Sequence, residues 1–265
     1  MKGLFLYKEL NKFYDIFAMY MENTTIFGLR AIIEAIDSGS TINKVYLQKG
    51  LRGSLFFELE TIIKKEKITT SFVPIEKLDR LSKNKNHQGA VAQISPIEFA
   101  DLEKLIETSL EATESPLFLI LDQISDVRNF GAIIRTAECT GVDGIIIQQG
   151  GSAPINAETI KTSAGAAFKL PICRVSHIKD AIYTLQASNI KILAATEKTD
   201  DLVYNIDLKQ PIAIVMGSEH RGINPSVLKI VDYKAKLPIL GSIDSLNVSV
   251  ACGAFLYEMI RQRIS

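Results

Sequence analysis

Short apolar runs alternate with amphipathic segments through the second half of the chain. The apolar runs have the length and content of buried strands. They lie at 117–121, 144–147, 190–195 and 211–216. The segments between them carry apolar residues at helical spacing, at 129–140, 156–164 and 178–188. Apolar strands that alternate with helices are typical of a parallel sheet covered on both faces. The pattern therefore predicts an α/β domain over 116–265.

A shorter version of the same alternation lies nearer the amino terminus. Helical spacing at 28–38 and 55–65 is interleaved with strand-like runs. These runs lie at 44–48, 70–73 and 89–94. Together they predict a small α/β domain over 25–95, near the lower size at which a domain folds alone. Residues 96–115 predict an acidic, helix-bearing linker. Residues 1–24 form an amino-terminal extension with apolar residues at helical spacing and no role that the sequence assigns.

The charge of the chain is balanced overall and uneven along its length. Lys plus Arg and Asp plus Glu both number 30 in 265 residues, so the net charge gives no hint of a polyanionic partner. Between Lys44 and Gln88, however, ten basic residues stand against five acids, and Ser95–Leu117 has six acids against Lys104 alone. The basic stretch predicts either a nucleic-acid surface or a solvated charge run, and charge alone does not separate the two.

Several classes of protein are disfavoured by what the sequence lacks. The three cysteines are far apart and outside any metal-binding spacing, which predicts a reducing cytoplasm, no metal site and no disulfide framework. No apolar run approaches the roughly 18 residues of a membrane span, and the start lacks a secretory cleavage pattern. A Gly-x-Gly-x-x-Gly loop after the first strand and a phosphate-binding loop are also missing, which disfavours the common nucleotide-binding sheets.

The polar loops that follow three predicted strands are the candidate site. They lie at 122–137, 217–222 and 238–253, and each contains glycine. Because ligands bind a parallel sheet at the carboxyl ends of its strands, we expect these loops to meet at one edge.

Taken together and in order, the three loops resemble the three motifs of the SpoU family of knotted methyltransferases. The matching stretches are Asn129-Phe-Gly131-Ala-Ile-Ile-Arg135, Gly217-Ser-Glu219-x-x-Gly222 and Leu237-Pro-x-x-Gly241-x-x-x-Ser245-Leu246-Asn247. Two further stretches resemble the branch that methylates a guanosine of large-subunit ribosomal RNA. These are Ile26-Phe-Gly28-Leu-Arg30 and Ser152-Ala-Pro154-Ile-Asn156, the latter followed by Ser163-Ala-Gly165. The resemblance covers about residues 25–263.

The resemblance implies a deep trefoil knot, a homodimer that packs through the knotted domain, and S-adenosyl-L-methionine as cofactor. The cofactor residues that it implies are Thr196, Gly217, Leu237, Ile239, Leu240 and Leu246. Physically, Gly217 allows close approach of the backbone, and Leu237, Ile239 and Leu246 can enclose the apolar part of adenine. Without the motifs, plain core packing would be the preferred interpretation of these apolar residues.

The catalytic residues implied by the resemblance are Arg135, Asn129, Glu219, Ser245 and Asn247. Arg135 is either a general base or a cation that holds phosphate and the developing alkoxide, and the second role is favoured because a guanidinium is a poor base in water. Glu219 anchors either Arg135 or the motif loops. Ser245, Asn247 and Asn129 have the alternative of serving only as helix caps. His220 occupies a variable motif position and is expected beside the site.

The sequence therefore predicts methyl transfer from S-adenosylmethionine to a ribose 2′-hydroxyl, on a guanosine of 23S ribosomal RNA. Candidate RNA contacts in the small domain are Arg30, Lys83, Lys85 and His87. Transfer RNA is the alternative substrate. A catalytically silent RNA-binding or ribosome-assembly factor on the same fold is the alternative of another class.

Overall fold

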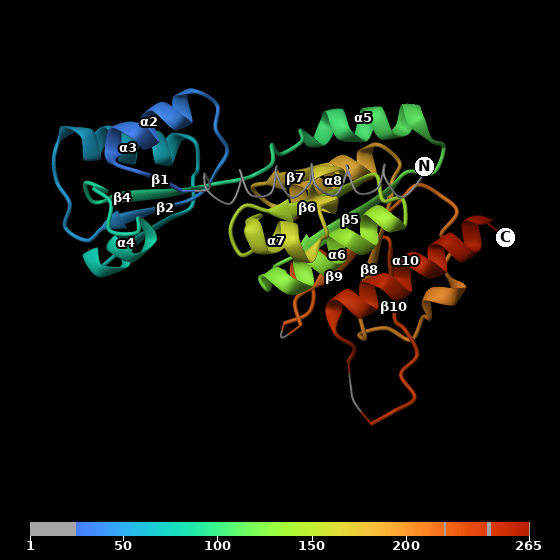
Figure 1. The fold of residues 1–265 in the computed structure, drawn as a ribbon. Helices are drawn as coiled ribbons and strands as arrows, with labels where there is room; N and C mark the ends of the chain where they lie inside the picture. Colours follow the sequence, from blue (N-terminus) through green and yellow to red (C-terminus); the bar gives the residue numbers. More distant parts are fainter. Residues whose placement is uncertain (1–24, 220, 243–244, 265) are drawn as a thin grey trace, which may run out of the picture. The chain divides into compact units, whose positions relative to one another are not determined.

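The computed structural model describes residues 25–219, 221–242 and 245–264, and the chain divides into two compact units. The small unit comprises residues up to Glu98 together with Pro154–Ala157, and the large unit comprises Phe99–Ala153 and Glu158 to the carboxyl end. Figure 1 labels the helices and strands. Each unit has its own hydrophobic core, so each is described by itself.

The described part of the small unit contains a four-stranded sheet in the order β1-β4-β2-β3. The strands are β1 (Thr25–Phe27), β2 (Ile42–Gln48), β3 (Thr70–Val73) and β4 (Ala90–Ile94). The helices are α2 (Leu29–Asp37), α3 (Ser54–Lys65) and α4 (Ile75–Leu81). Helices α2 and α3 cover one face of the sheet, and α4 lies against the other (Figure 1). The sequence predicted the longer elements but not β1 or α4, which are too short to show a period.

The described part of the large unit contains a six-stranded sheet in the order β10-β8-β9-β5-β6-β7, with every neighbouring pair parallel. This confirms the predicted α/β class. The central strands are β5 (Leu117–Asp122), β8 (Lys191–Ala195) and β9 (Ile212–Gly217). The outer strands are β6 (Gly144–Gln148), β7 (Ile172–Val175) and β10 (Tyr233–Ala235). Every residue of β5 is buried, as expected for a strand covered on both faces.

Helices cover both faces of this sheet. One face packs against α5 (Leu102–Ala112), α8 (Ile178–Ala187) and the short α9 (Pro225–Leu228). On the other side of the large unit, α6 (Val127–Cys139) packs beside α10 (Val248–Ile264), as Figure 1 shows. The remaining elements are α7 (Ala157–Thr162) and the 3₁₀ turns η1 (Ala166–Phe168) and η2 (Val203–Asn205).

Helix α10 is fixed at its far end by Arg263. The guanidinium group donates hydrogen bonds to the backbone carbonyls of Ser115 (2.6 Å), Leu208 (3.0 Å) and Gln210 (3.1 Å). These carbonyls directly precede β5 and β9, so a single side chain joins the last helix to the starts of two central strands.

The segment predicted as an acidic linker differs from that description. Its helix is present as α5, but Leu105 and Ile106 are buried in the core of the large unit, and Ala100 pairs with Cys173 beside β7. The acids lie on the outer side, because Asp101, Glu103 and Glu107 are exposed. The charge pattern thus marks an amphipathic surface helix. The sequence also missed β7, which has four residues, and predicted β10 only as a strand without bounds before the loop at 238–253. The knot stays a prediction.

No helix within the described residues has the length and apolar content needed to cross a lipid bilayer.

Candidate active site

A cavity of about 410 Å³ lies at the carboxyl ends of β8, β9 and β10, where the sheet edge meets the start of α10. Its walls come from four segments. The ends of β8 and β9 and the loops after them contribute Ala195–Lys198, Met216–Glu219 and Arg221–Ile223. The segment after β10 contributes Lys236, Leu237 and Ile239, and the start of α10 with the residues before it contributes Ser245, Leu246, Val248, Ala251 and Phe255. This is the edge at which the parallel strands of an α/β sheet bind ligands. The second and third motif loops therefore meet as the sequence predicted.

The cavity has an apolar wall that is open to solvent. Ile239 and Leu246 line it although 43% and 47% of their surfaces are exposed, and Leu237 lies half-buried beside them. Large apolar side chains left exposed around a cavity are typical of a ligand site rather than of core packing. Leu240 behaves differently: it is 99% exposed and does not line the cavity, so this structure gives it no contact there.

Thr196 supplies a polar group at the floor of the cavity. It is buried directly after β8, its backbone N–H donates to the carbonyl of Ala235, and its hydroxyl oxygen accepts from the N–H of Lys198. The side chain thus shapes the loop that carries Lys198 along the cavity wall.

Gly217, the last residue of β9, is required by close packing of backbone. A Cβ placed there would lie 2.2 Å from the carbonyl carbon of Gly222 and 2.3 Å from the nitrogen of Ile223. The chain between them turns back on itself, since the N–H of Gly222 donates to the carbonyl of Ser218 (2.8 Å). Gly217 therefore has no room for a side chain, and Gly222 has a φ of 66°, a left-handed conformation that glycine adopts without strain.

The three motif loops are joined by the side chain of Asn247. Its Nδ2 amide donates to Oδ1 of Asn129 (3.0 Å), in the first motif, and to Oε1 of Glu219 (2.6 Å), in the second. The same Oε1 accepts weakly from the N–H of Val248 (3.5 Å). Glu219 also lines the cavity. Of its two predicted roles, this structure shows Glu219 anchoring the motif loops.

Asn247 is at the same time the cap of α10. Its Oδ1 accepts from the N–H groups of Ser249 (3.0 Å) and Val250 (3.3 Å) and from the Ser249 hydroxyl (2.6 Å). A capping role and a bridging role thus coexist in one amide. Asn129 does not cap α6, because Asp126 accepts from the N–H groups of Arg128 and Asn129. The Asn129 amide is therefore available to Asn247. Ser245 lines the cavity.

Arg135 stands apart from this network. It lies on α6 six residues beyond Asn129, its side chain is exposed, and it does not line the cavity. Among the described residues, no acid forms an ion pair with it. The structure therefore leaves Arg135 as a free cation on the surface of α6. His220 lies outside the described residues.

Two structural supports of the site escaped the sequence analysis. Asp122, at the end of β5, is buried, and its Oδ2 accepts from the N–H of Asn224 (2.7 Å), just past the second motif. Burial raises the pKa of this carboxyl group. Gly131 allows α6 to approach Thr162, whose Oγ1 would lie 1.8 Å from an added Cβ. The sequence did offer a signal for Asp122, because a carboxylate at the end of an otherwise apolar strand indicates a buried polar contact.

The candidate RNA contacts divide into exposed and buried side chains. Arg30, Lys83 and Lys85 are exposed on the small unit. His87 is buried: Nε2 lies 3.0 Å from Oδ1 of Asp79, and Nδ1 accepts from the N–H of Gly89. Because both ring nitrogens are engaged inside the unit, His87 holds its own loop and is not placed to contact a phosphate.

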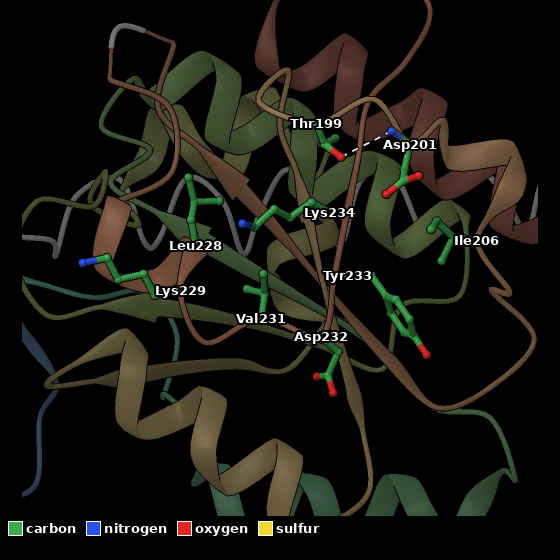
Figure 2. Close-up of a pocket in the computed structure, with 9 residues that line it drawn as sticks. All are labelled: Thr199, Asp201, Ile206, Leu228, Lys229, Val231, Asp232, Tyr233 and Lys234. Atoms are coloured by element: carbon green, nitrogen blue, oxygen red, sulfur yellow. Dashed lines mark hydrogen bonds between the residues drawn. The ribbon is translucent and has the colours of Figure 1, made fainter.

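A second cavity, of about 500 Å³, lies along the outer edge strand β10 (Figure 2). Asp201, Asp232, Tyr233 and Lys234 are among its lining residues, and none of the motif residues reaches it. It is therefore a separate surface feature. In the part of the chain that the structure describes, no group of three or more His, Cys, Asp and Glu side chains is arranged to hold a metal ion.

Family models match both units. Residues 116–257 match the SpoU rRNA methylase family, and residues 25–100 match the RNA 2′-O ribose methyltransferase substrate-binding domain. A protein of Staphylococcus aureus, named for the TrmH family of tRNA/rRNA methyltransferases, is 37% identical over 244 residues, which is 92% of this chain and 98% of that protein.

Solved structures share the fold. The SpoU methyltransferase AviRb from Streptomyces viridochromogenes is 26% identical with a TM-score of 0.58, covering 91% of this chain and 89% of AviRb. The complex of AviRb with AdoMet superposes with a TM-score of 0.59 at 23% identity, over 95% of this chain and 98% of AviRb, and shows the same fold.

Replacing Gly217 with alanine is expected to disrupt the second motif, because the new methyl group has only backbone atoms to displace. We expect a fall in the melting temperature and loss of S-adenosylmethionine binding, measured by differential scanning fluorimetry and calorimetry. Gly241→Ala is the control, since nothing lies within 4 Å of a Cβ there. Equal behaviour of the two variants would contradict the close-packing argument.

Asn247→Asp separates capping from bridging. The carboxylate keeps an acceptor for the start of α10 but cannot donate to Asn129 or Glu219. We expect the melting temperature to fall, because both hydrogen bonds are lost and the new carboxylate lies against that of Glu219, and the cofactor affinity to fall at least about tenfold, since a hydrogen bond to a charged group is worth about 1.5–3 kcal/mol. Asn189→Asp, the same change in the turn before β8, is the control. Unchanged affinity in the Asn247 variant would show that the bridge is dispensable.

Proposed function

Since this chain belongs to the SpoU rRNA methylase family and is an RNA methyltransferase, we propose that it methylates a ribose 2′-hydroxyl of RNA, using S-adenosyl-L-methionine. The observation that carries the proposal is the convergence of all three motif loops on Asn247, beside the cavity at the sheet edge. A methyl-transfer site needs its motif segments fixed to each other, because the reacting groups must be held in one geometry.

The cavity fits the proposed cofactor in size and chemistry. Its volume of about 410 Å³ lies in the range of small-molecule sites. The apolar wall of Leu237, Ile239 and Leu246 suits an adenine ring, and the charged lining residues Glu197, Lys198 and Arg221 suit a charged amino-acid group. We place Thr196 and Gly217 in the same site, because one shapes its floor and the other its turn.

In this proposal the motif residues divide into those that hold the site together and those that face the substrates. S-adenosylmethionine supplies an electrophilic methyl group on a sulfonium, which requires no metal. Asn129, Glu219 and Asn247 hold the loops in register, and Ser245 offers a hydroxyl at the cavity wall. Arg135 acts as a cation for the substrate phosphate and the developing alkoxide, because a guanidinium in solvent is too strongly protonated to serve as a base.

The position of Arg135 favours a homodimer. Within its own chain Arg135 does not line the cavity. Its helix, α6, packs beside α10, and the neighbouring Thr136 would lie 3.7 Å from a Cβ placed on Gly253 of α10. The outer face of α10 carries the exposed Val250 and Tyr257, one heptad apart. A second copy packed on this face would cover the apolar stripe and receive Arg135 near its own site.

The substrate that we propose is a guanosine of 23S ribosomal RNA. Support comes from the small unit, which matches a substrate-binding domain of ribose methyltransferases, and from the two stretches that resemble the ribosomal branch. Mapping ribose methylation in ribosomal and transfer RNA from cells with and without this gene tests the assignment. One missing methyl group in the 23S RNA is the expected result, and a methyl group missing only from transfer RNA would replace ribosomal RNA as substrate.

Arg135→Ala is expected to leave cofactor affinity nearly intact and to lower methyl transfer by about 10²–10³, as for loss of one preorganised charge-stabilising group. Calorimetry measures the first quantity, and transfer of a radiolabelled methyl group to RNA measures the second. Lys161→Ala, an equal loss of charge on α7, is the control. Turnover close to that of the unaltered protein would make Arg135 a surface residue without a catalytic role.

A further inference from the structure

The sheet of the small unit has two unlike faces. Alternate residues of β2 and β4, such as Val45 and Ala92, enter the core beneath α2 and α3. On the other face, Phe27, Val91 and Tyr46 are direct cross-strand partners that α4 partly covers. The next row on this face is Thr25, Gln93 and Lys44, and all three are only half-buried. This second face is therefore partly open beside α4.

Three lysine ammonium groups lie over aromatic rings of this open face. Nζ of Lys44, from β2, is 5.2 Å from the centroid of the Tyr46 ring, and Nζ of Lys77, from α4, is 5.5 Å from the same centroid. Nζ of Lys85, from the loop after α4, is 5.5 Å from the centroid of the Phe27 ring. The negative faces of the rings attract ammonium groups at such distances, so the rings hold the lysines in place.

These lysines lack the acids that accompany Lys64 and Lys65 on the same unit. On α3, Lys64 pairs with Glu60 (3.4 Å) and Lys65 with Glu66 (3.6 Å). Among the described residues, no carboxylate forms an ion pair with Lys44, Lys77 or Lys85. Two like charges gathered over one ring without a counter-charge repel each other, and an anion bound between them removes the repulsion.

The loop that carries Lys85 is held in a fixed shape. The hydroxyl of the buried Ser82 donates to the carbonyls of Asp79 and Lys85, and the buried His87 bridges Asp79 and the N–H of Gly89. Between these anchors, Lys83 and Asn84 have φ values of 55° and 58°, a left-handed conformation that few non-glycine residues adopt. Such strain persists only where the surroundings impose it. His87 is thus a positioning residue for Lys85.

We propose that the face formed by Phe27, Lys44, Tyr46, Lys77 and Lys85, called here the lysine–aromatic face, binds the phosphate backbone of the RNA substrate. This inference rests on the proposed function and names the surface that receives its substrate. Lys77 lies in the basic stretch between Lys44 and Gln88 but was not among the candidate RNA contacts named from the sequence. Phosphates are the expected partners because preorganised, uncompensated ammonium groups bind polyanions by releasing counterions.

The test compares two double variants of the full-length protein with equal loss of charge: Lys77→Gln with Lys85→Gln, and Lys64→Gln with Lys65→Gln. Affinity for 23S ribosomal RNA transcribed in vitro is measured by filter binding over a range of salt concentrations. For the first variant we expect affinity to fall at least about tenfold at low salt, and the slope of log affinity against log salt to decrease by about 1.4–1.8 for two lost phosphate contacts. The second variant is expected to match the unaltered protein.

A third variant tests the role of the rings. Tyr46→Leu keeps all the charges but removes the surface over which Lys44 and Lys77 lie, so affinity should fall while Tyr46→Phe restores it. Melting temperatures and cofactor affinity, measured in parallel, show whether each variant is folded. If the Lys77/Lys85 variant binds and methylates RNA like the unaltered protein, the lysine–aromatic face is not the RNA surface, and the proposed function stands. If the unaltered protein methylates no RNA, the proposed function itself fails.

Discussion

The candidate site depends on one side-chain amide. The side-chain oxygen of Asn247 caps the start of α10, and its nitrogen donates to Asn129, at the start of α6, and to Glu219, in the loop after β9. If the amide turned over, an oxygen would face the acceptors and an NH₂ group would face the free N–H groups of the helix. Both sets of partners therefore fix a single orientation of the amide. In that orientation the amide holds the start of α10, Asn129 and Glu219 in fixed positions relative to one another.

Close packing of the backbone in the second motif positions a side chain that lines the cavity. Gly217 and Gly222 let the second motif fold into a tight turn, and this turn places Glu219 where it can accept from Asn247. Asp122, at the end of β5, fixes the carboxyl end of the same loop by accepting a hydrogen bond from the N–H of Asn224. Because the loops are fixed by backbone and polar contacts, the apolar residues Ile239 and Leu246 are not needed for the core and remain exposed to a ligand.

The sequence predicted those parts whose signal is local or repeated. Long apolar strands such as 117–121 and amphipathic helices such as α6 were predicted within a few residues of their bounds. Strand β1 has three residues, too few for a period, and the four residues of β7 include Arg174, which interrupts the apolar run; both form because a neighbouring strand offers its edge. The motif loops were expected to meet, and they do. The burial of His87 could not be foreseen, because it depends on Asp79 across a turn, and the cluster of Lys44, Lys77 and Lys85 depends on strand register.

The contacts of the last helix have a consequence for the order of events during synthesis. Asn247 and Asn129 are 118 positions apart, and Arg263 reaches the carbonyl of Ser115 across 148 positions. Contacts so distant in sequence are slow to form, since a long loop must close before they stabilise anything. A nascent chain can build its small unit and the first strands of the large sheet on the ribosome, but it lacks the capped helix until α10 has emerged. The three motif segments can therefore be joined only after α10 has been synthesised.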